Sequence, residues 1–111
     1  MLPPRIPKKL KRSTRWRSQA HCTHIRKHAC SVCWSTAGIQ VAHVRLGSGA
    51  GIGQKPSDYR AVSLCGECHR RQHTVGEATF WKGVDVEALI ASFIAESPRR
   101  REIEQAMREA A

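Results

Sequence analysis

The residues best suited to chemistry are two Cys-x-x-Cys pairs, Cys30/Cys33 and Cys65/Cys68. Each pair can present two thiolates from one turn, and the 31 residues between the pairs could form a β-hairpin that brings the turns together. Four sulfur ligands complete the tetrahedral shell that zinc prefers and leave no open position, so the sequence predicts a structural zinc ion. A redox role is the weaker interpretation, because no thioredoxin-like βαβ pattern surrounds either pair.

A second candidate group consists of three histidines and one aspartate. His69 and His73 are four residues apart, so on a helix both imidazoles project from one face and could share a metal ion. His43 lies in a β-branched, roughly alternating run, which places it on a strand. Asp58 is the first acidic residue of the chain. We expect it to bind metal or to orient a partner, with a turn-capping aspartate as the alternative.

Weaker signals come from the other histidines and from the tryptophans. The remaining histidines cluster near Cys22, the cysteine without a repeat partner: His21, His24 and His28. The last two have helical i, i+4 spacing and could bind a second metal, but we favour surface or nucleic-acid-facing side chains. Trp16 lies among arginines and could stack on a base, whereas Trp34 and Trp81 are expected to cover the zinc turns.

The charge of the chain is strongly asymmetric. The formal net charge is +10, and residues 1–57 carry 11 Lys or Arg and no acidic residue. This pattern indicates a polyanionic partner, with a solvated tail as the alternative. Membrane binding is disfavoured because the basic stretch has no amphipathic apolar face. The candidate nucleic-acid-binding residues are Lys8, Lys9, Lys11, Arg12, Arg15, Arg17, Arg26, Lys27, Arg45, Lys55 and Arg60.

The length of the apolar runs limits the cellular compartments in which we expect the protein. No run approaches the roughly 18 residues of a membrane span, and no apolar run of signal-peptide length follows Met1. We therefore expect a cytoplasmic protein, in which cysteine pairs bind metal rather than form disulfides.

Local patterns predict the elements that position these residues. Residues 1–17 are rich in proline and cations and are expected to form a basic flexible arm. Ser18 could cap a short helix through His28. Strands are predicted over 39–45 and 59–64 and a helix over 67–74, with a glycine-rich loop over 47–58 that fits neither a Walker nor a dinucleotide-binding pattern.

Two more helices are predicted after the second cysteine pair. Apolar residues recur at helical spacing from Val86 to Ile94, with Asp85 placed to cap them. Ser97-Pro98 then opens a charged terminal helix with only Ile103 and Met107 to bury. The predicted fold class is therefore a small zinc-stapled α+β domain over 18–83, with helices over 84–111 packed on it.

These motifs together resemble the HNH, or ββα-metal, endonuclease family. The resemblance is strongest to its phage and prophage branch, which includes the recombination-enhancement (Ref) nuclease and YbcO-like proteins. It covers about residues 18–81. The motifs that carry it are Cys30-x-x-Cys33, Ala42-His43-Val44, Lys55-Pro56-Ser57-Asp58 and Leu64-Cys65-x-x-Cys68-His69-x-x-x-His73.

The resemblance implies a hairpin followed by a helix, pinned by the four-cysteine zinc ion. His43 would be the general base that activates a water molecule. His69 and His73, with Asp58, would hold Mg²⁺ or another divalent ion that stabilises the leaving oxygen. The implied substrate is DNA, with RNA left open, and a recombinase is a candidate partner in the bacterial host cell.

Two positions depart from the family pattern. The asparagine that usually stands nine residues before the final histidine is Arg60, and the residue before the base is Ala42. Arg60 could contact the phosphate or pair with Asp58. We predict a metal-dependent HNH endonuclease acting in recombination or DNA processing. The alternatives are a non-catalytic zinc-stapled nucleic-acid-binding module and a structural phage protein that uses only the basic arm.

Overall fold

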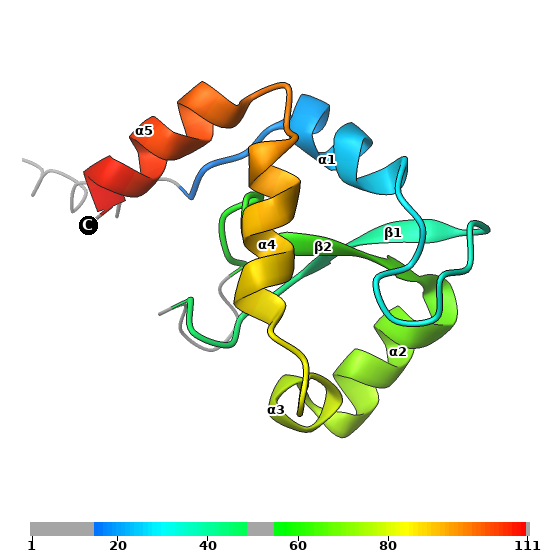
Figure 1. The fold of residues 1–111 in the computed structure, drawn as a ribbon. Helices are drawn as coiled ribbons and strands as arrows, with labels where there is room; N and C mark the ends of the chain where they lie inside the picture. Colours follow the sequence, from blue (N-terminus) through cyan, green and yellow to red (C-terminus); the bar gives the residue numbers. More distant parts are fainter. Residues whose placement is uncertain (1–14, 49–54, 111) are drawn as a thin grey trace, which may run out of the picture.

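Two antiparallel strands and five helices make up the fold in the computed structural model, which describes residues 15–48 and 55–110 (Figure 1). In chain order, the elements are α1 (Gln19–Arg26), β1 (Ile39–His43), β2 (Ala61–Cys65), α2 (Gly66–Val75), α3 (Glu77–Phe80), α4 (Val86–Ala95) and α5 (Arg100–Ala110). This is the small α+β architecture that the sequence predicts.

The hairpin formed by β1 and β2 is the centre of the molecule. Its register places Ile39 opposite Cys65 and His43 opposite Ala61. Every position of β2 is buried, whereas β1 leaves Gln40 exposed and His43 partly exposed. The more open strand therefore supplies polar side chains to the surface, while the covered strand supplies the core.

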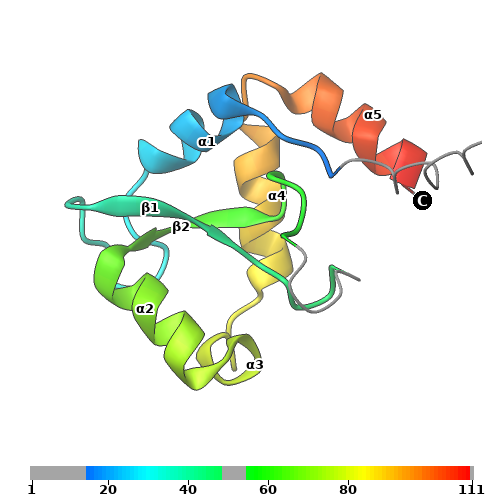
Figure 2. The same ribbon diagram turned by 180° about the vertical axis from the view of Figure 1, so that it is seen from behind.

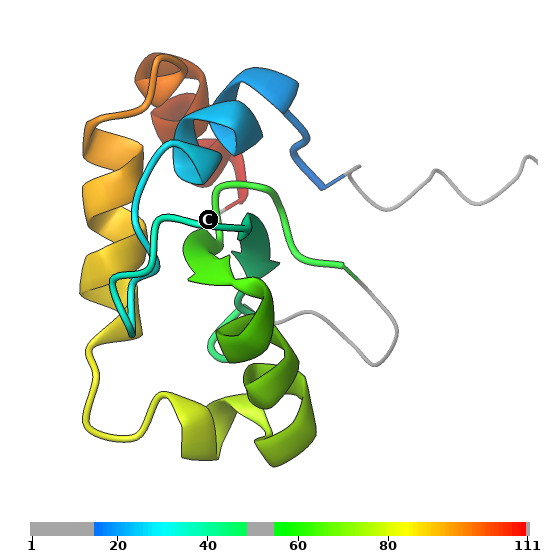
Figure 3. The same cartoon turned by 90° about the vertical axis from the view of Figure 1, so that its right-hand side faces the viewer.

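Helices surround this hairpin. α1 and α2 contact both strands, and α4 contacts β2. Figures 2 and 3 show α1 and α2 on opposite sides of the hairpin, with α4 running along a third side. α5 contacts α4 and continues away from the hairpin (Figure 1). None of the described helices is long and apolar enough to cross a membrane.

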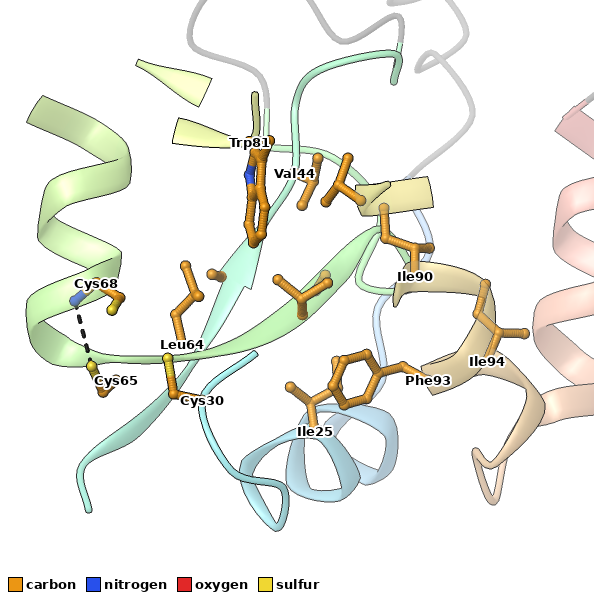
Figure 4. Close-up of a cluster of buried hydrophobic side chains, with 14 of the residues drawn as sticks. Ile25, Cys30, Val44, Leu64, Cys65, Cys68, Trp81, Ile90, Phe93 and Ile94 are labelled. Atoms are coloured by element: carbon orange, nitrogen blue, oxygen red, sulfur yellow. Dashed lines mark hydrogen bonds between the residues drawn. The ribbon is translucent and has the colours of Figure 1, made fainter. Parts of the chain in front are cut away.

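One cluster of buried apolar side chains joins the helices to the sheet (Figure 4). Ile25 from α1, Leu64 from β2 and Phe93 from α4 all belong to it. Burying one such side chain stabilises the fold by about 1.5–3 kcal/mol. Three of the four repeat-pair cysteines belong to the same cluster, so the cysteine group is continuous with the core.

The structure confirms the predicted elements to within a few residues. Ser18 caps α1 by accepting the N–H of His21 at 3.2 Å, and Asp85 caps α4 by accepting the N–H of Ala88 at 3.0 Å. The short helix α3 has no counterpart among the predicted elements. Its four residues are too few for hydrophobic periodicity to reveal.

The terminal helix corrects two expectations. α5 starts at Arg100 rather than at Pro98. Ile103 is fully buried as predicted, but Met107 is 44% exposed. The physical reason is the direction of the helix, because only its beginning lies against α4 and Met107 is one turn farther out.

The end of the predicted arm is tied into the fold. The Trp16 N–H donates to Ser57 Oγ at 3.1 Å, and the Asp58 N–H donates to the Trp16 carbonyl at 2.8 Å. The Arg17 guanidinium donates to the carbonyl of Lys55 at 3.0 Å and to that of Pro56. Residues 1–14, with Lys8, Lys9, Lys11 and Arg12, and the loop segment 49–54 lie outside the described residues.

Candidate functional site

The four cysteines predicted to bind zinc lie together at one end of the hairpin. Their Sγ atoms are all within 4.8 Å of one another. Cys30 and Cys33 belong to the turn before β1, whereas Cys65 ends β2 and caps α2 by accepting the Cys68 N–H at 3.5 Å (Figure 4). The pairing of Ile39 with Cys65 brings the two turns together. The cluster could hold a metal ion, and its donor set is one that zinc prefers.

The electrostatics of this cluster favour a bound cation. Burial raises the pKa of Cys68, and the neighbouring thiols raise it further. Burial acts in the same direction on Cys30, but backbone N–H groups from both cysteine turns outweigh it and lower that pKa to about 6. The Cys30 thiol therefore ionises readily, whereas the Cys68 thiol resists, chiefly because it is buried. A divalent ion would supply a counter-charge for the thiolates.

A cleft of about 710 Å³ opens beside the hairpin. Its walls come from α1, β1, segment 55–58 and α2. Its charged lining residues are four cations and one acid: Arg17, Arg26, Arg45, Lys55 and Asp58. The predicted base His43 and the predicted metal ligands His69 and His73 line the same cleft. The fold thus gathers one surface from segments that are far apart in the sequence.

His43 and Asp58 form a hydrogen-bonded pair within the cleft. His43 Nε2 donates to Asp58 Oδ1 at 2.9 Å. The Ser18 N–H donates to Asp58 Oδ2 at 2.8 Å, and Arg17 Nη1 lies 3.4 Å from Oδ1. An ionised carboxylate only accepts hydrogen bonds, so Nε2 carries the proton and Nδ1 keeps its lone pair. Asp58 therefore orients His43, one of the two roles considered for it.

The protonation states of this pair suit proton abstraction. Burial lowers the pKa of His43, with the hydrogen bond to Asp58 opposing that effect. Burial disfavours ionisation of Asp58, but hydrogen bonds from His43 and the Ser18 N–H hold its pKa below the usual value. At neutral pH the pair is consequently a neutral imidazole beside a carboxylate.

His69 and His73 form a second pair on α2. Their Nε2 atoms lie 3.2 Å apart, and Gln40 Oε1 accepts from His69 Nδ1 at 2.8 Å. An amide oxygen cannot donate, so this contact fixes the tautomer of His69 and leaves its Nε2 without a proton. Two nitrogens that each lie about 2.0–2.1 Å from one ion would be separated by about 3 Å, so the pair fits a shared metal.

The predicted metal ligands do not converge into a single group. Asp58 is hydrogen-bonded to His43, while His69 and His73 are hydrogen-bonded to each other. Within residues 15–48 and 55–110, only the four cysteines bring three or more His, Cys, Asp or Glu ligand atoms this close together.

Arg60 pairs with a carboxylate other than the expected Asp58. Its guanidinium binds Glu87 of α4 through two contacts of 2.6 and 3.1 Å and donates to the Leu46 carbonyl at 2.8 Å. Pairing with Asp58 is therefore wrong, and Arg60 is not among the residues that line the cleft. The side chain is only 16% exposed, because it fastens α4 to the chain after β1. Lys27 is exposed and also lies outside the cleft lining.

The expectation of surface or nucleic-acid-facing histidines on α1 is wrong for His21. Its ring is fully buried, and Nδ1 lies 2.8 Å from Ser97 Oγ. His24 Nε2 contacts the Phe93 carbonyl at 3.2 Å, and His28 lies 3.5 Å from Glu96. These rings pack between α1 and α4, because the face of α1 that carries them is also the face that meets the core.

Among the cleft-lining residues that sequence reasoning missed are two glutamines and a cysteine, namely Gln40, Gln19 and Cys22. Gln40 matters most, since it orients His69. A polar residue on the exposed side of a strand carries no sequence signal of such a role. Cys22 is buried beside Asp58, and burial together with that carboxylate raises the pKa of its thiol.

Comparisons with protein-family models, with curated proteins and with solved structures found no match to this chain.

Proposed function

We propose that this protein is a metal-dependent nuclease of the HNH type that hydrolyses phosphodiester bonds in DNA. The observation that carries the proposal is the His43–Asp58 pair, joined at 2.9 Å inside a cleft whose other charged residues are cations. Hydrolysis of a polyanion needs such a base next to positive groups. The motif resemblance supports the same assignment. A phage or prophage origin and a recombinase partner rest on that resemblance alone.

His43 is assigned as the general base. Because Asp58 holds the Nε2 proton, Nδ1 is the ring nitrogen able to take a proton from water. Asp58 also stabilises the imidazolium that results, since its own pKa is low. Arg17 and the Ser18 N–H fix the carboxylate in turn, so the base has a set orientation before substrate arrives.

His69 and His73 are assigned to a divalent ion. When bound, that ion would stabilise charge on the leaving oxygen. Imidazole donors suit transition metals better than magnesium, which prefers oxygen ligands. We therefore expect manganese, nickel or zinc to support activity at lower concentrations than magnesium does. The four-cysteine site is assigned to structural zinc, because its ligands fill the coordination shell.

A plasmid-nicking assay with each metal and with a chelator tests the assignment. His43→Ala should keep DNA binding and zinc but lose about 10²- to 10⁴-fold in rate, as expected for loss of general-base assistance. His69→Ala should instead require more of the activating metal. His28→Ala is the matched control, since His28 does not line the cleft.

The absence of cleavage with every metal would overturn the nuclease proposal. So would a His43→Ala protein that cuts as fast as wild type. The binding module then becomes the better function, and the engagement of Arg60 by Glu87 already favours it, because Arg60 does not replace the missing asparagine in the cleft.

The pH profile gives an independent check of the base. Activity requires neutral His43, so the rate should rise from acid toward neutrality. Because burial lowers the pKa of His43, the midpoint of this rise should lie below the ordinary value of 6.5. A midpoint above that value would contradict the assignment.

The arm should contribute to affinity without contributing to chemistry. Trp16 and Arg17 are part of the fold, so a deletion should stop at residue 14. Removing the five cations of residues 1–14 should lower the slope of log affinity against log salt by up to about 4.5, at about 0.9 per lost phosphate contact. An unchanged slope would identify the arm as a solubilising tail.

A further inference from the structure

Trp34 stands apart from the other two tryptophans. Trp34 is 76% exposed, whereas Trp81 is buried in the core and Trp16 packs against Tyr59. The expectation that Trp34 covers the zinc turn is therefore wrong. The indole faces solvent at the second cysteine of the first Cys-x-x-Cys pair, where it covers little of the protein.

The backbone at Trp34 makes this exposure more informative. Its φ is 65°, and no other non-glycine residue within the described ranges has a positive φ. The turn requires this conformation, because the Trp34 N–H donates to the Cys30 carbonyl at 3.1 Å and the Cys30 N–H donates to the Ser35 carbonyl at 2.8 Å. Glycine adopts such a φ freely, while a bulky side chain is strained there. The tryptophan therefore strains the backbone of the turn, and its exposed side chain gains little packing to offset that strain.

The surroundings favour a nucleobase as the partner of this ring. The nearest exposed apolar residue in sequence is Val32, at 38% exposure. Two side chains are far too little for a protein interface, which buries about 800 Å² per partner. A stacked base needs only one ring face. Segment 1–57 carries no acidic residue, so a polyanion can approach the turn without repulsion from that half of the chain.

The turn also lies within reach of the cleft. Ile39 and Gln40 line the cleft and follow Trp34 by five and six residues. Five residues span at most about 17 Å even when fully extended. A strand bound in the cleft could therefore extend over the indole.

We propose that Trp34 is a stacking platform for an unpaired or extruded base of the nucleic acid that the cleft binds. This inference rests on the proposed function and deepens it, because it gives the protein a preference for single-stranded or distorted substrate. Stacking tolerates any sequence, since every base has a π-face. The platform would add affinity without adding a charge contact.

The test compares Trp34→Gly with wild type in binding to a single-stranded oligonucleotide and to a duplex of the same sequence. Trp34→Gly should bind the single strand about 5- to 150-fold more weakly, the range that loss of one stacked base gives, with less change for the duplex. The slope of log affinity against log salt should not change, because no phosphate contact is lost. The variant should retain its zinc and unfold at a temperature no lower than wild type, because glycine relieves the strained φ.

Three further variants complete the test. Trp34→Phe should retain most of the single-strand affinity and Trp34→Leu should not, since stacking needs a ring. Val32→Ala is the matched control for a lost apolar side chain beside the turn and should bind as wild type does. Binding of the single strand should also quench tryptophan emission in wild type but not in Trp34→Gly.

The outcomes separate this inference from the proposed function. In one outcome, wild type binds and cuts DNA while Trp34→Gly binds the single strand as tightly as wild type does. In that case the stacking proposal is wrong and the nuclease proposal stands. The platform is also wrong if Trp34→Phe and Trp34→Leu bind the single strand alike. A Trp34→Gly chain that loses zinc would overturn the reasoning about the turn. If wild type binds no nucleic acid, both proposals are wrong.

Discussion

His21 should make the fold sensitive to acid. Its ring is fully buried, Nδ1 contacts Ser97 Oγ at 2.8 Å, and Nε2 has no hydrogen-bond partner. Burial lowers the pKa of His21 to about 4, with the charge of His24 adding to the effect and that of Asp58 opposing it. A proton on this ring is therefore costly in the folded state.

The size of the effect follows from the difference between the folded and unfolded states. The pKa of His21 falls from its ordinary value of 6.5 to about 4 on folding, so the unfolded chain takes up the proton first as the pH drops. The contribution to stability is complete above about pH 6.5 and is lost as the pH falls toward about 4. At about 1.36 kcal/mol per unit, roughly 2.5 kcal/mol should be lost between about pH 7.5 and pH 4.5.

Urea unfolding of wild type and His21→Phe across this pH range measures the effect. Phenylalanine does not titrate, so the difference in free energy of unfolding should shift by about 2.5 kcal/mol in favour of the variant as the pH falls. The other ionisable groups are the same in both proteins and cancel in the comparison. Ser97→Ala keeps the imidazole, so its curve should run parallel to wild type but lower by about 1 kcal/mol. Parallel curves for wild type and His21→Phe would refute the reasoning.

Three other substitutions test the metal centre, the Arg60 contact and the terminal helix. Cys65→Ser should lose bound zinc and unfold, as metal analysis and circular dichroism would report; an unchanged melting temperature and zinc content would contradict the ligand assignment. Arg60→Ala and Glu87→Ala should show a coupling of at most about 1 kcal/mol in a double-mutant cycle of unfolding, because Glu87 is 56% exposed and solvent screens the pair. A larger coupling would mean that the pair is less screened than its exposure indicates. Ile103→Ala should cost about 2–4 kcal/mol and Met107→Ala less than about 0.5, so equal losses would place α5 differently.

Short-range features of this protein could be predicted from its sequence. Ser18 and Asp85 indicate the starts of α1 and α4, because a cap acts on an N–H group only three residues away. The four-cysteine cluster is equally predictable, since each Cys-x-x-Cys turn is a local structure and the chain between the pairs suits a hairpin. The spacing of His69 and His73 likewise places both rings on one face of α2.

Contacts between distant segments were decided only by the tertiary structure. Asp58 stands out in the sequence for its isolation in a basic chain, but its role follows from the approach of β1, which places His43 at 2.9 Å. Arg60 pairs with Glu87, which lies 27 residues later on α4, and Gln40 accepts a hydrogen bond from His69, 29 residues away. No periodicity encodes such pairs, because they depend on how the helices pack on the hairpin. The same packing buries His21 while leaving Trp34 in solvent, although both residue types have an apolar ring and a polar atom.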